Sequence, residues 1–387
     1  MRGPLRGIRE AMRRRRGLAV VGSVVVLAAA GTAGCGSSKS SSGGGASTSV
    51  STTGGSSSAK GGYTVVLSNA YMGNAWRKTM VKNFTTAADQ DKQSGLLKDY
   101  QVLLTQDNKP TDQIAQLQTQ LLKRPDAIVI DAASPTALNP VIEKACAAGI
   151  KVVVFDSLVT APCAYKLNHN LVDLGQQEGE FIGRKLGGRG NVIELRGISG
   201  SEPDVQIHQG IQAGLKQFPG IKVVATVDGE ASQTTAQQAV QSALRSLPRV
   251  DAVMTQGGGD AYGVIQAFEA SGKPVPPIVL GSGGNELQWW QAKHKANGYT
   301  TLSISTMPGQ STIALGEAIM LLEGKQVPKE ILNLPLLQVS DNTLAAWAKA
   351  TPTSDIASPV YSQSDVESLV QAAQSGGTLP NPPVPSN

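Results

Sequence analysis

Short apolar runs rich in β-branched residues alternate with helix-length segments through most of this chain, and this alternation is the feature that most constrains its fold. The run from Lys151 to Phe155 (K-V-V-V-F) is typical, since it is apolar almost throughout. Strands that helices cover on both faces have this pattern, whereas strands with one solvated face alternate between apolar and polar residues. The repeat of strand and helix therefore predicts parallel sheets packed between helices.

The repeat occurs in two rounds, separated by an irregular stretch from 159 to 170. In the first round the expected strands are 63–67, 101–104, 126–130 and 151–155, and the expected helices are 75–90, 111–123 and 136–148. In the second round the expected strands are 192–195, 221–227, 250–254, 277–280 and 301–304, and the expected helices are 174–186, 205–217, 235–246, 261–270 and 310–322. Because crossovers between parallel strands are short and right-handed, two such rounds predict two doubly wound α/β lobes.

The N-terminus has the order of an export signal. Four arginines at 13–16 precede an apolar run from Leu18 to Ala30, and small residues then lead to Cys35. This order is similar to a bacterial lipoprotein signal, in which the cysteine is acylated, although the usual leucine three positions earlier is Thr32. We expect residues 1–34 to be the signal and Cys35 the lipidation site, so that the protein is anchored by lipid to the outer face of the cell membrane. The alternative is an ordinary signal peptide or an uncleaved anchor, with Cys35 incidental.

The positive charge of the chain comes from this N-terminal segment. The whole sequence has a net charge of +5, but residues 1–34 contain seven arginines and one glutamate. The remaining chain has 27 basic and 28 acidic residues, and thus a net charge of −1. A chain without a basic excess has little to neutralise phosphates, so the composition argues against nucleic acid as a partner.

Two segments contain too few apolar residues to fold. Residues 35–62 are almost entirely Gly, Ser, Thr and Ala after the cysteine, which predicts a flexible tether with a reach of about 30 Å. Residues 376–387 contain four prolines and are expected to be a disordered tail. The roughly 315 residues between these segments exceed what one hydrophobic core usually supports, which again indicates two lobes.

Cys146 and Cys163 are the only cysteines besides Cys35. An even pair in an exported chain favours a disulfide. Cys146 lies near the end of an expected helix and Cys163 in the loop after the next strand, so the two residues can meet. We expect a disulfide between them, and two buried free thiols are the alternative.

Polar residues follow the expected strands, where ligands of doubly wound sheets bind. Asp131 follows the third strand and Asp156 the fourth. The other candidate ligand contacts at these edges are Asn69, Tyr71, Asn74, Trp76, Gln256, Asp260 and Asn285. Carboxylates and amides suit the hydroxyls of a sugar, and an aromatic ring suits its C–H face. Structural roles stay open as alternatives: a loop cap for Asp156, helix core for Trp76 and a helix N-cap for Asp260.

Three segments together resemble a known family: K-V-V-V-F-D at 151–156, N-V-I-E-L-R-G at 191–197 and the unit from Asp251 to Lys273. They are similar to the sugar-binding proteins of ABC importers, the ribose-binding-protein-like type I periplasmic class, from about Gly62 to Val339. The resemblance implies two lobes joined by three crossover strands, near 168–170, 305–307 and 337–341. The first lobe would comprise 63–169 and 307–338, and the second 170–306 and 339–375.

The resemblance also implies roles for single residues. Asn74 and Trp76 match the family's ligand-binding asparagine and aromatic residue, and Asp156 matches the aspartate that typically binds sugar hydroxyls. Asp131 replaces an amide-bearing residue. Further positions depart from the family pattern, and these are Ser157, Val205, Gly257 and the pair Ser282-Gly283. Ribose specificity is therefore not carried over.

The sequence thus predicts a monomeric solute receptor without catalytic residues, metal or cofactor. It would bind a sugar or sugar-like polyol between its lobes and deliver it to an ABC permease in the membrane. A sensor of the same fold, with a membrane receptor as its partner, is an alternative that the sequence leaves open. A Rossmann-like enzyme is less favoured, because the glycine-rich run from Gly257 to Gly263 is out of register with G-x-G-x-x-G and lies deep in the chain.

Overall fold

The computed structural model describes residues 61–247 and 249–386. The expected signal at 1–34, the lipidation site Cys35 and the tether up to residue 60 lie outside the described residues. Within the two described ranges, no helix combines the length and the apolar character needed to cross a bilayer.

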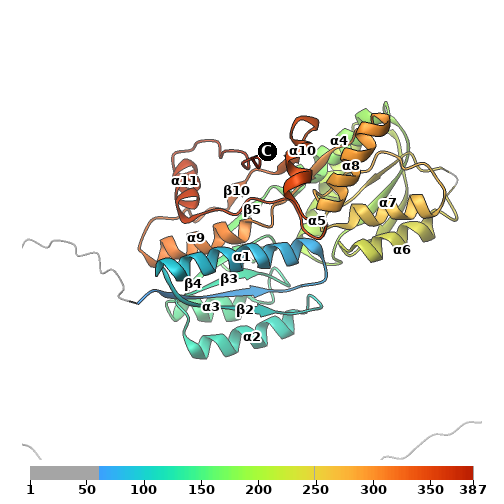
Figure 1. Ribbon diagram of the computed structural model, residues 1–387. Helices are drawn as coiled ribbons and strands as arrows, with labels where there is room; N and C mark the ends of the chain where they lie inside the picture. The colour runs from blue at the N-terminus through green and yellow to red at the C-terminus, as the bar shows by residue number, and fades with distance from the viewer. Residues whose placement is uncertain (1–60, 248, 387) are drawn as a thin grey trace, which may run out of the picture. The chain divides into compact units, whose positions relative to one another are not determined.

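The first lobe is built on a six-stranded sheet in the order β10-β5-β4-β3-β1-β2, in which all neighbours are parallel. Its strands are β1 (Tyr63–Asn69), β2 (Leu97–Leu104), β3 (Ala127–Asp131), β4 (Lys151–Phe155), β5 (Tyr165–His169) and β10 (Leu332–Leu334). Helices α1 (Ala75–Ser94) and α9 (Gln310–Leu322) pack on one face, and α2 (Pro110–Lys123) and α3 (Asn139–Ala147) on the other (Figure 1).

The apolar strands of this sheet are buried on both faces. Val65 belongs to the core under α1 and α9, whereas its neighbour Val66 belongs to the core that contains Leu117 of α2 and Ile142 of α3. Successive side chains of a strand point to opposite faces, so a strand between two helical layers favours apolar residues at every position until the polar residues at its carboxyl end. This explains the continuous apolar runs and confirms the predicted α/β fold class.

The second lobe has a parallel sheet in the order β7-β6-β8, formed by β6 (Arg189–Arg196), β7 (Gly220–Asp228) and β8 (Ala252–Met254). The strand expected at 277–280 is present only as single parallel bridges, from Ile278 to Val253 and from Leu280 to Ser303. Through them the sheet continues to β9 (Ser303–Ser305), which pairs antiparallel with β11 (Leu337–Val339). The helices of this lobe are α4 (Leu171–Lys185), α5 (Glu202–Leu215), α6 (Gln233–Ala243), α7 (Asp260–Ala270), α8 (Gly284–Asn297) and α10 (Asp341–Ala350).

Helices α4 and α5 approach each other through glycines. A Cβ atom added to Gly175 would lie 2.1 Å from the carbonyl oxygen of Ile207, and one added to Gly210 would lie 2.0 Å from that of Val172. These distances are shorter than any real Cβ contact, so the backbones touch where no side chain fits. The glycines therefore set the separation of the two helices that lead to the pocket described below.

The chain passes between the lobes at three places that match the implied crossovers: between β5 and α4, between β9 and α9, and between β10 and β11. A further passage follows α10. Helix α10 packs on α8 in the second lobe, but α11 (Gln363–Gln374) packs on α9 in the first. The segment 339–375, expected to belong to the second lobe alone, is thus divided between the two lobes, because the apolar residues Val366, Leu369 and Val370 of α11 join the core beside α9.

The structure links Cys146 to Cys163 by a disulfide that ties the end of α3 to the loop before β5. The residues of the expected disordered tail that the structure describes, 376–386, contain no helix or strand. They nevertheless have a defined path. Leu379 packs against the main core, and Asn381, Pro382 and Val384 line a hollow together with residues of the β5–α4 and β10–β11 connections.

Candidate ligand-binding site

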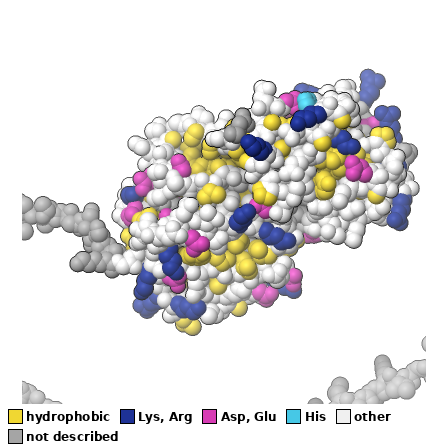
Figure 2. Space-filling model, viewed as in Figure 1, with side chains coloured by type: hydrophobic (Ala, Val, Ile, Leu, Met, Phe, Trp, Pro, Cys, Tyr) yellow, Lys and Arg dark blue, Asp and Glu magenta, His cyan; other side chains and the backbone are white. Residues whose placement is uncertain are grey.

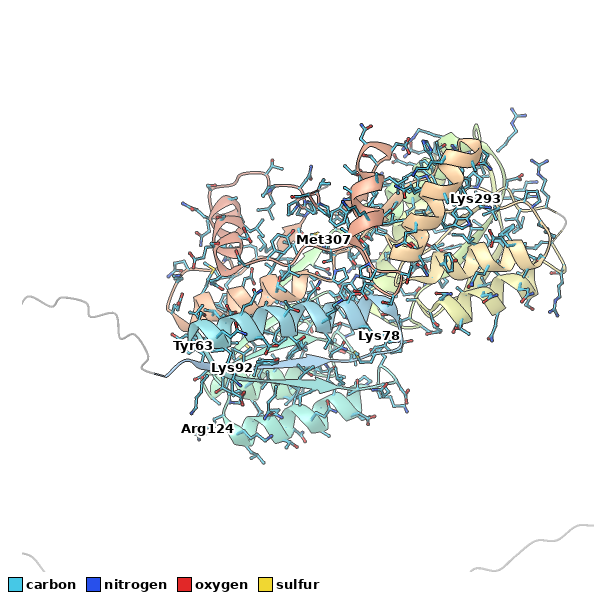
Figure 3. All side chains as sticks on the ribbon, in the orientation of Figure 1. Tyr63, Lys78, Lys92, Arg124, Lys293 and Met307 are labelled. Carbon is cyan, nitrogen blue, oxygen red and sulfur yellow. A yellow bond between two sulfur atoms is a disulfide. The ribbon has the colours of Figure 1, made fainter. Side chains whose placement is uncertain are left out.

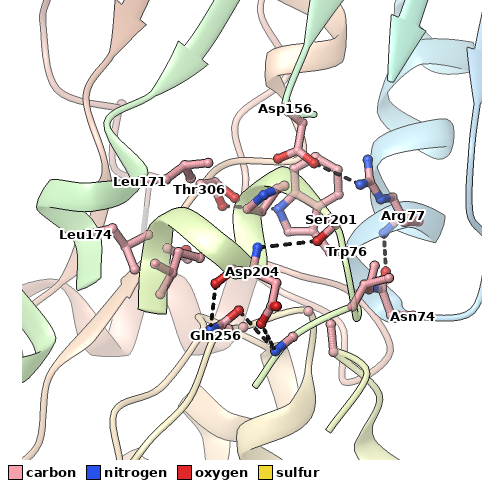
Figure 4. A pocket seen from close by; sticks show the side chains of 18 of the residues that line it. Asn74, Trp76, Arg77, Asp156, Leu171, Leu174, Ser201, Asp204, Gln256 and Thr306 are labelled. Carbon is pink, nitrogen blue, oxygen red and sulfur yellow. Dashed lines mark hydrogen bonds and ion pairs between the residues drawn. The ribbon is translucent and has the colours of Figure 1, made fainter. Parts of the chain in front are cut away.

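A pocket lies where the carboxyl ends of the strands of the two lobes face each other, with an empty volume of about 630 Å³ that includes space open to solvent (Figure 4). The first lobe contributes the start of α1 and the end of β4. The second contributes the starts of α4 and α5 and the loops after β6, β7 and β8. The principal lining residues are Asn74, Trp76, Arg77, Asp156, Leu171, Leu174, Ser201, Asp204, Gln256, Gly257, Gly258 and Thr306.

The start of α1 faces the second lobe. Lys78, in the first turn of α1, lies at this end of the helix, whereas Lys92 and the first strand residue, Tyr63, lie at the far end of the lobe (Figure 3). Asn74 is the N-cap, and its side-chain oxygen accepts a hydrogen bond of 2.8 Å from the backbone N–H of Arg77. Capping fixes the first turn, and the first turn places Trp76 and Arg77 on the pocket wall.

Arg77 is the charged centre of the first-lobe wall. Its guanidinium forms an ion pair of 2.9 Å with Asp156 and a second ion pair with Asp131. All three side chains are at most 8% exposed. Burial lowers the pKa of Arg77, and the neighbouring Asp156 opposes that shift. One arginine therefore neutralises part of the charge of two buried carboxylates.

Asp156 is held in an uncommon backbone conformation at the carboxyl end of β4. Its φ is 58°, in the left-handed region that aspartate enters more readily than most residues. Its carbonyl oxygen accepts a bond of 2.7 Å from the Asn168 amide, and its carboxylate accepts one of 3.2 Å from the Gln310 amide. Such conformations persist only where surrounding contacts impose them, and they concentrate at binding sites.

Trp76 joins the pocket to a crossover. Its indole N–H donates a bond of 3.3 Å to the carbonyl oxygen of Thr306, in the connection between β9 and α9. The Arg77 guanidinium carbon lies 4.9 Å from the centre of its ring. The ring is thus held in place by a hydrogen bond and a cation–π contact, and it lines the pocket as a fixed apolar surface.

The opposite wall carries an ion pair and an amide. Arg196 donates hydrogen bonds of 2.8 and 2.7 Å to the two carboxylate oxygens of Asp204. The Gln256 side chain accepts from the backbone N–H of Gly197 at 3.0 Å and donates to the carbonyl oxygen of Asp204 at 3.3 Å. The polar groups of this wall are therefore oriented by their neighbours before any ligand binds.

The structure brings four of the nine candidate contacts to this pocket: Asn74, Trp76, Asp156 and Gln256. Asn285 lines an adjoining hollow. Asn69 and Tyr71 do not line the pocket. The buried Asn69 side chain donates a hydrogen bond to the carbonyl oxygen of Tyr71, and Tyr71 forms a β-bridge with Asp107. Asp131 is buried behind Arg77. Asp260 is fully buried at the start of α7, where burial and the nearby Glu286 raise its pKa.

Sequence reasoning missed Arg77 and Asp204. Arg77 directly follows Trp76, one of the predicted contacts, and an arginine in the first turn of a helix is normally solvated. Asp204 lies in the first turn of α5, and its backbone N–H donates a hydrogen bond of 3.3 Å to the hydroxyl of the N-cap residue Ser201. Such pairs are common in the first turns of helices without any role in binding.

The charges of the pocket nearly cancel, which favours an uncharged ligand. Arg77 and Arg196 face Asp131, Asp156 and Asp204, and each of these carboxylates is ion-paired. In the described part of the chain no group of three or more His, Cys, Asp or Glu residues is placed to hold a metal ion. On the face shown in Figure 2, Lys and Arg are interspersed with Asp and Glu. Hydrogen-bonding groups beside a fixed aromatic ring suit a hydroxylated, neutral small molecule.

The chain is similar to several known proteins in sequence and in fold. The xylitol-binding protein of Mycolicibacterium smegmatis is 26% identical over 174 residues, which cover 44% of this chain and only 50% of that protein. The ribose import binding protein of Bacillus subtilis is 24% identical over 273 residues, covering 70% of this chain and 86% of that protein. The crystal structure of an ABC transporter solute binding protein from Thermobispora bispora is 39% identical, covers 84% of this chain and all of that chain, and superposes with a TM-score of 0.79.

The sequence family described as the periplasmic binding protein domain matches residues 65–326, which include every residue that lines the pocket and most of the strands, though not β10 and β11. This span is more than half of the chain, and the α/β fold with parallel sheets agrees with it. The chain belongs to the periplasmic binding protein family.

Proposed function

We propose that this protein is the extracellular solute receptor of an ABC importer and that its ligand is a neutral sugar or polyol. The observation that carries the proposal is the pocket between the lobes, where paired carboxylates and amides surround the fixed Trp76 ring. Sugar hydroxyls accept and donate hydrogen bonds, so oriented carboxylates, guanidinium groups and amides satisfy them together. The relatives named for xylitol and ribose support this class of ligand.

The receptor works by ligand-stabilised closure of its lobes. Asp156 belongs to the first lobe and Asp204 to the second, so a ligand that contacts both has its full set of contacts only in the closed state. A ligand shifts the equilibrium toward the state that it binds better. The permease then recognises the closed state, and the receptor acts as a monomer.

The proposal includes export of the protein and its attachment to the outer face of the membrane by a lipid. The arginine-rich start, the apolar run and Cys35 predict a lipid anchor, and residues 36–62 supply the tether. Labelling of growing cells with a radioactive fatty acid tests this point, because the wild-type chain should be labelled and the Cys35→Ser variant should not. A labelled Cys35→Ser variant, or an unlabelled wild type in the membrane fraction, would rule out acylation at this cysteine.

The central test is thermal unfolding of the chain from Gly61 onward against pentoses, hexoses, pentitols and cyclitols. A ligand at 100 times its dissociation constant stabilises the folded state by about 2.7 kcal/mol, which raises the midpoint by several degrees. Small-angle scattering with the same ligand should show a smaller radius of gyration. A well-folded sample that responds to none of these compounds would contradict the proposal.

A further inference from the structure

Gln310 connects the ligand pocket to a crossover between the lobes, although it does not line the pocket itself. It is the first residue of α9, directly after the connection from β9, and it is fully buried. Its side-chain amide donates a hydrogen bond of 3.2 Å to Oδ1 of Asp156 at the end of β4. The same connection accepts the indole N–H of Trp76 at the carbonyl oxygen of Thr306. Two side chains of the pocket are therefore held from one crossover.

The two oxygens of the Asp156 carboxylate have different partners. Oδ2 forms the ion pair of 2.9 Å with Arg77, and Oδ1 accepts from Gln310. A carboxylate rotates easily about its Cβ–Cγ bond, and a guanidinium group readily binds both oxygens of one carboxylate. Arg77 alone would therefore not fix the plane of this carboxylate. The hydrogen bond from Gln310 keeps Oδ1 directed away from Arg77 and so determines that plane.

The Gln310 amide is itself oriented by a buried histidine. His169, at the end of β5, is 2% exposed, and burial lowers its pKa to about 3 although its contact with the Gln310 side chain opposes that shift. It is therefore a neutral imidazole with one N–H to donate. In the described part of the chain, neither ring nitrogen has another partner, and neither does the amide oxygen of Gln310. With this oxygen turned to His169, the amide presents its NH2 group to Asp156.

The backbone of Asp156 is held separately, by a residue beside a second crossover. The Asn168 amide, on β5 before the connection to α4, donates a hydrogen bond of 2.7 Å to the carbonyl oxygen of Asp156. Different groups thus fix the main chain of Asp156 and the plane of its carboxylate. A substitution of Gln310 should disturb the carboxylate and leave the main chain in place.

We propose that Gln310 is a positioning residue, which holds the Asp156 carboxylate in the plane in which it accepts hydrogen bonds from the hydroxyls of the ligand. Gln310 acts through Asp156, because it does not line the pocket. Its single bond to Oδ1 leaves acceptor capacity on both carboxylate oxygens. This inference rests on the proposed function, because it concerns a residue that the same sugar or polyol would contact.

The first test is the pH dependence of sugar affinity in Gln310→Glu, measured by isothermal titration calorimetry. The probe is the compound that the wild type binds most tightly among D-ribose, D-xylose, D-glucose, D-galactose and xylitol. At about pH 5.5 the new carboxyl and Asp156 share one proton, so an O–H replaces the amide donor and the affinity should lie within about threefold of the wild type. At about pH 9 the proton is lost and the two carboxylates repel each other, so the affinity should be about tenfold or more weaker than that of the wild type at the same pH.

Comparison with the wild type at each pH removes the effects of other groups near Asp156. The charged and titratable side chains around it are Arg77 on α1, Asp131 on β3, His169 on β5 and Glu202 on α5. The matched control is Gln363→Glu, which makes the same change at the first residue of another helix of this lobe, α11. This control should bind the probe as the wild type does at both pH values.

A second variant, Gln310→Met, keeps the length of the side chain without its donor and decides the matter if the glutamate variant does not fold, which thermal unfolding at each pH shows. Its affinity should be about fivefold or more weaker at both pH values, because Asp156 loses a buried hydrogen bond. If the methionine variant binds as tightly as the wild type, or if the folded glutamate variant shows no loss of affinity with rising pH relative to the wild type, the positioning role is overturned and the sugar receptor stands. If the wild type binds none of the five compounds, both proposals are overturned.

Discussion

The Arg77 guanidinium in the first turn of α1 lies 2.9 Å from the Asp156 carboxylate at the end of β4, and both side chains are buried. Arg77 also forms an ion pair with Asp131, so one guanidinium group contacts carboxylates at the carboxyl ends of two neighbouring strands, β3 and β4. A buried carboxylate without a partner would take up a proton or destabilise the fold. The two ion pairs of Arg77 therefore offset part of the free-energy cost of burying both carboxylates.

Replacement of Asp156 by asparagine should weaken sugar binding by about tenfold or more, because the strongest acceptor of the pocket is lost and Arg77 keeps only one ion pair. The midpoint of thermal unfolding should fall as well. Calorimetric titration below that midpoint checks the affinity. The exposed Asp112→Asn on α2 is the control, and an unchanged affinity of Asp156→Asn would remove Asp156 from the site.

Ligand binding should change tryptophan fluorescence through Trp76. The sequence contains four tryptophans, and Trp76 is the only one that lines the pocket. We expect the emission change to disappear in Trp76→Phe, while Trp76→Ala loses about tenfold in affinity because an aromatic contact is removed. A full emission change in Trp76→Phe would mean that another tryptophan reports lobe movement.

Gly175→Ala should destabilise the fold although alanine favours helices. The added methyl would overlap the Ile207 carbonyl at the contact between α4 and α5, and forced separation of packed helices should lower the free energy of unfolding by about 2 kcal/mol. Urea unfolding measures the change. Val172→Ala, at an exposed position of the same helix, should change stability far less, and equal effects would show that the glycine contact is not tight.

Glu317→Gln should stabilise the protein at pH 8 and have little effect at pH 4. Glu317 is 1% exposed on α9, and burial raises its pKa to about 8 from an ordinary value of 4.5. Below pH 4.5 the residue is protonated in the folded and unfolded states alike. As the pH rises from 4.5 to 8 only the unfolded state releases the proton, so the wild type loses stability, on the order of 3 kcal/mol.

Unfolding by urea at several pH values checks this expectation. The difference between Glu317→Gln and the wild type should grow between pH 4.5 and pH 8, whereas the exposed Glu143→Gln should show no such trend. A constant difference across this range would mean that Glu317 is ionised in the folded state, with a partner that the structure does not place beside it.

Local patterns predicted the elements that carry the site, and the structure shows where these patterns were sufficient. Helix α9 has the expected bounds, 310–322, and Asp156 follows β4 as expected. Both depend on the order of apolar residues within a short window. Helix α11 was not predicted to join the first lobe. Its apolar face would suit a helix of either lobe, so only the contact with α9 shows to which lobe it belongs.

The sequence by itself determined the two rounds of strand and helix and the strand ends where polar residues gather, and it favoured a disulfide between Cys146 and Cys163 over two free thiols. These properties follow from the periodicity of apolar residues and the spacing of cysteines. The tertiary structure alone decided that Arg77 meets Asp131 and Asp156, and that Gly258 packs closely against Asn74 and Ala231. Such contacts depend on how elements far apart in the chain pack against each other. A local sequence pattern does not predict the distance between residues on those elements.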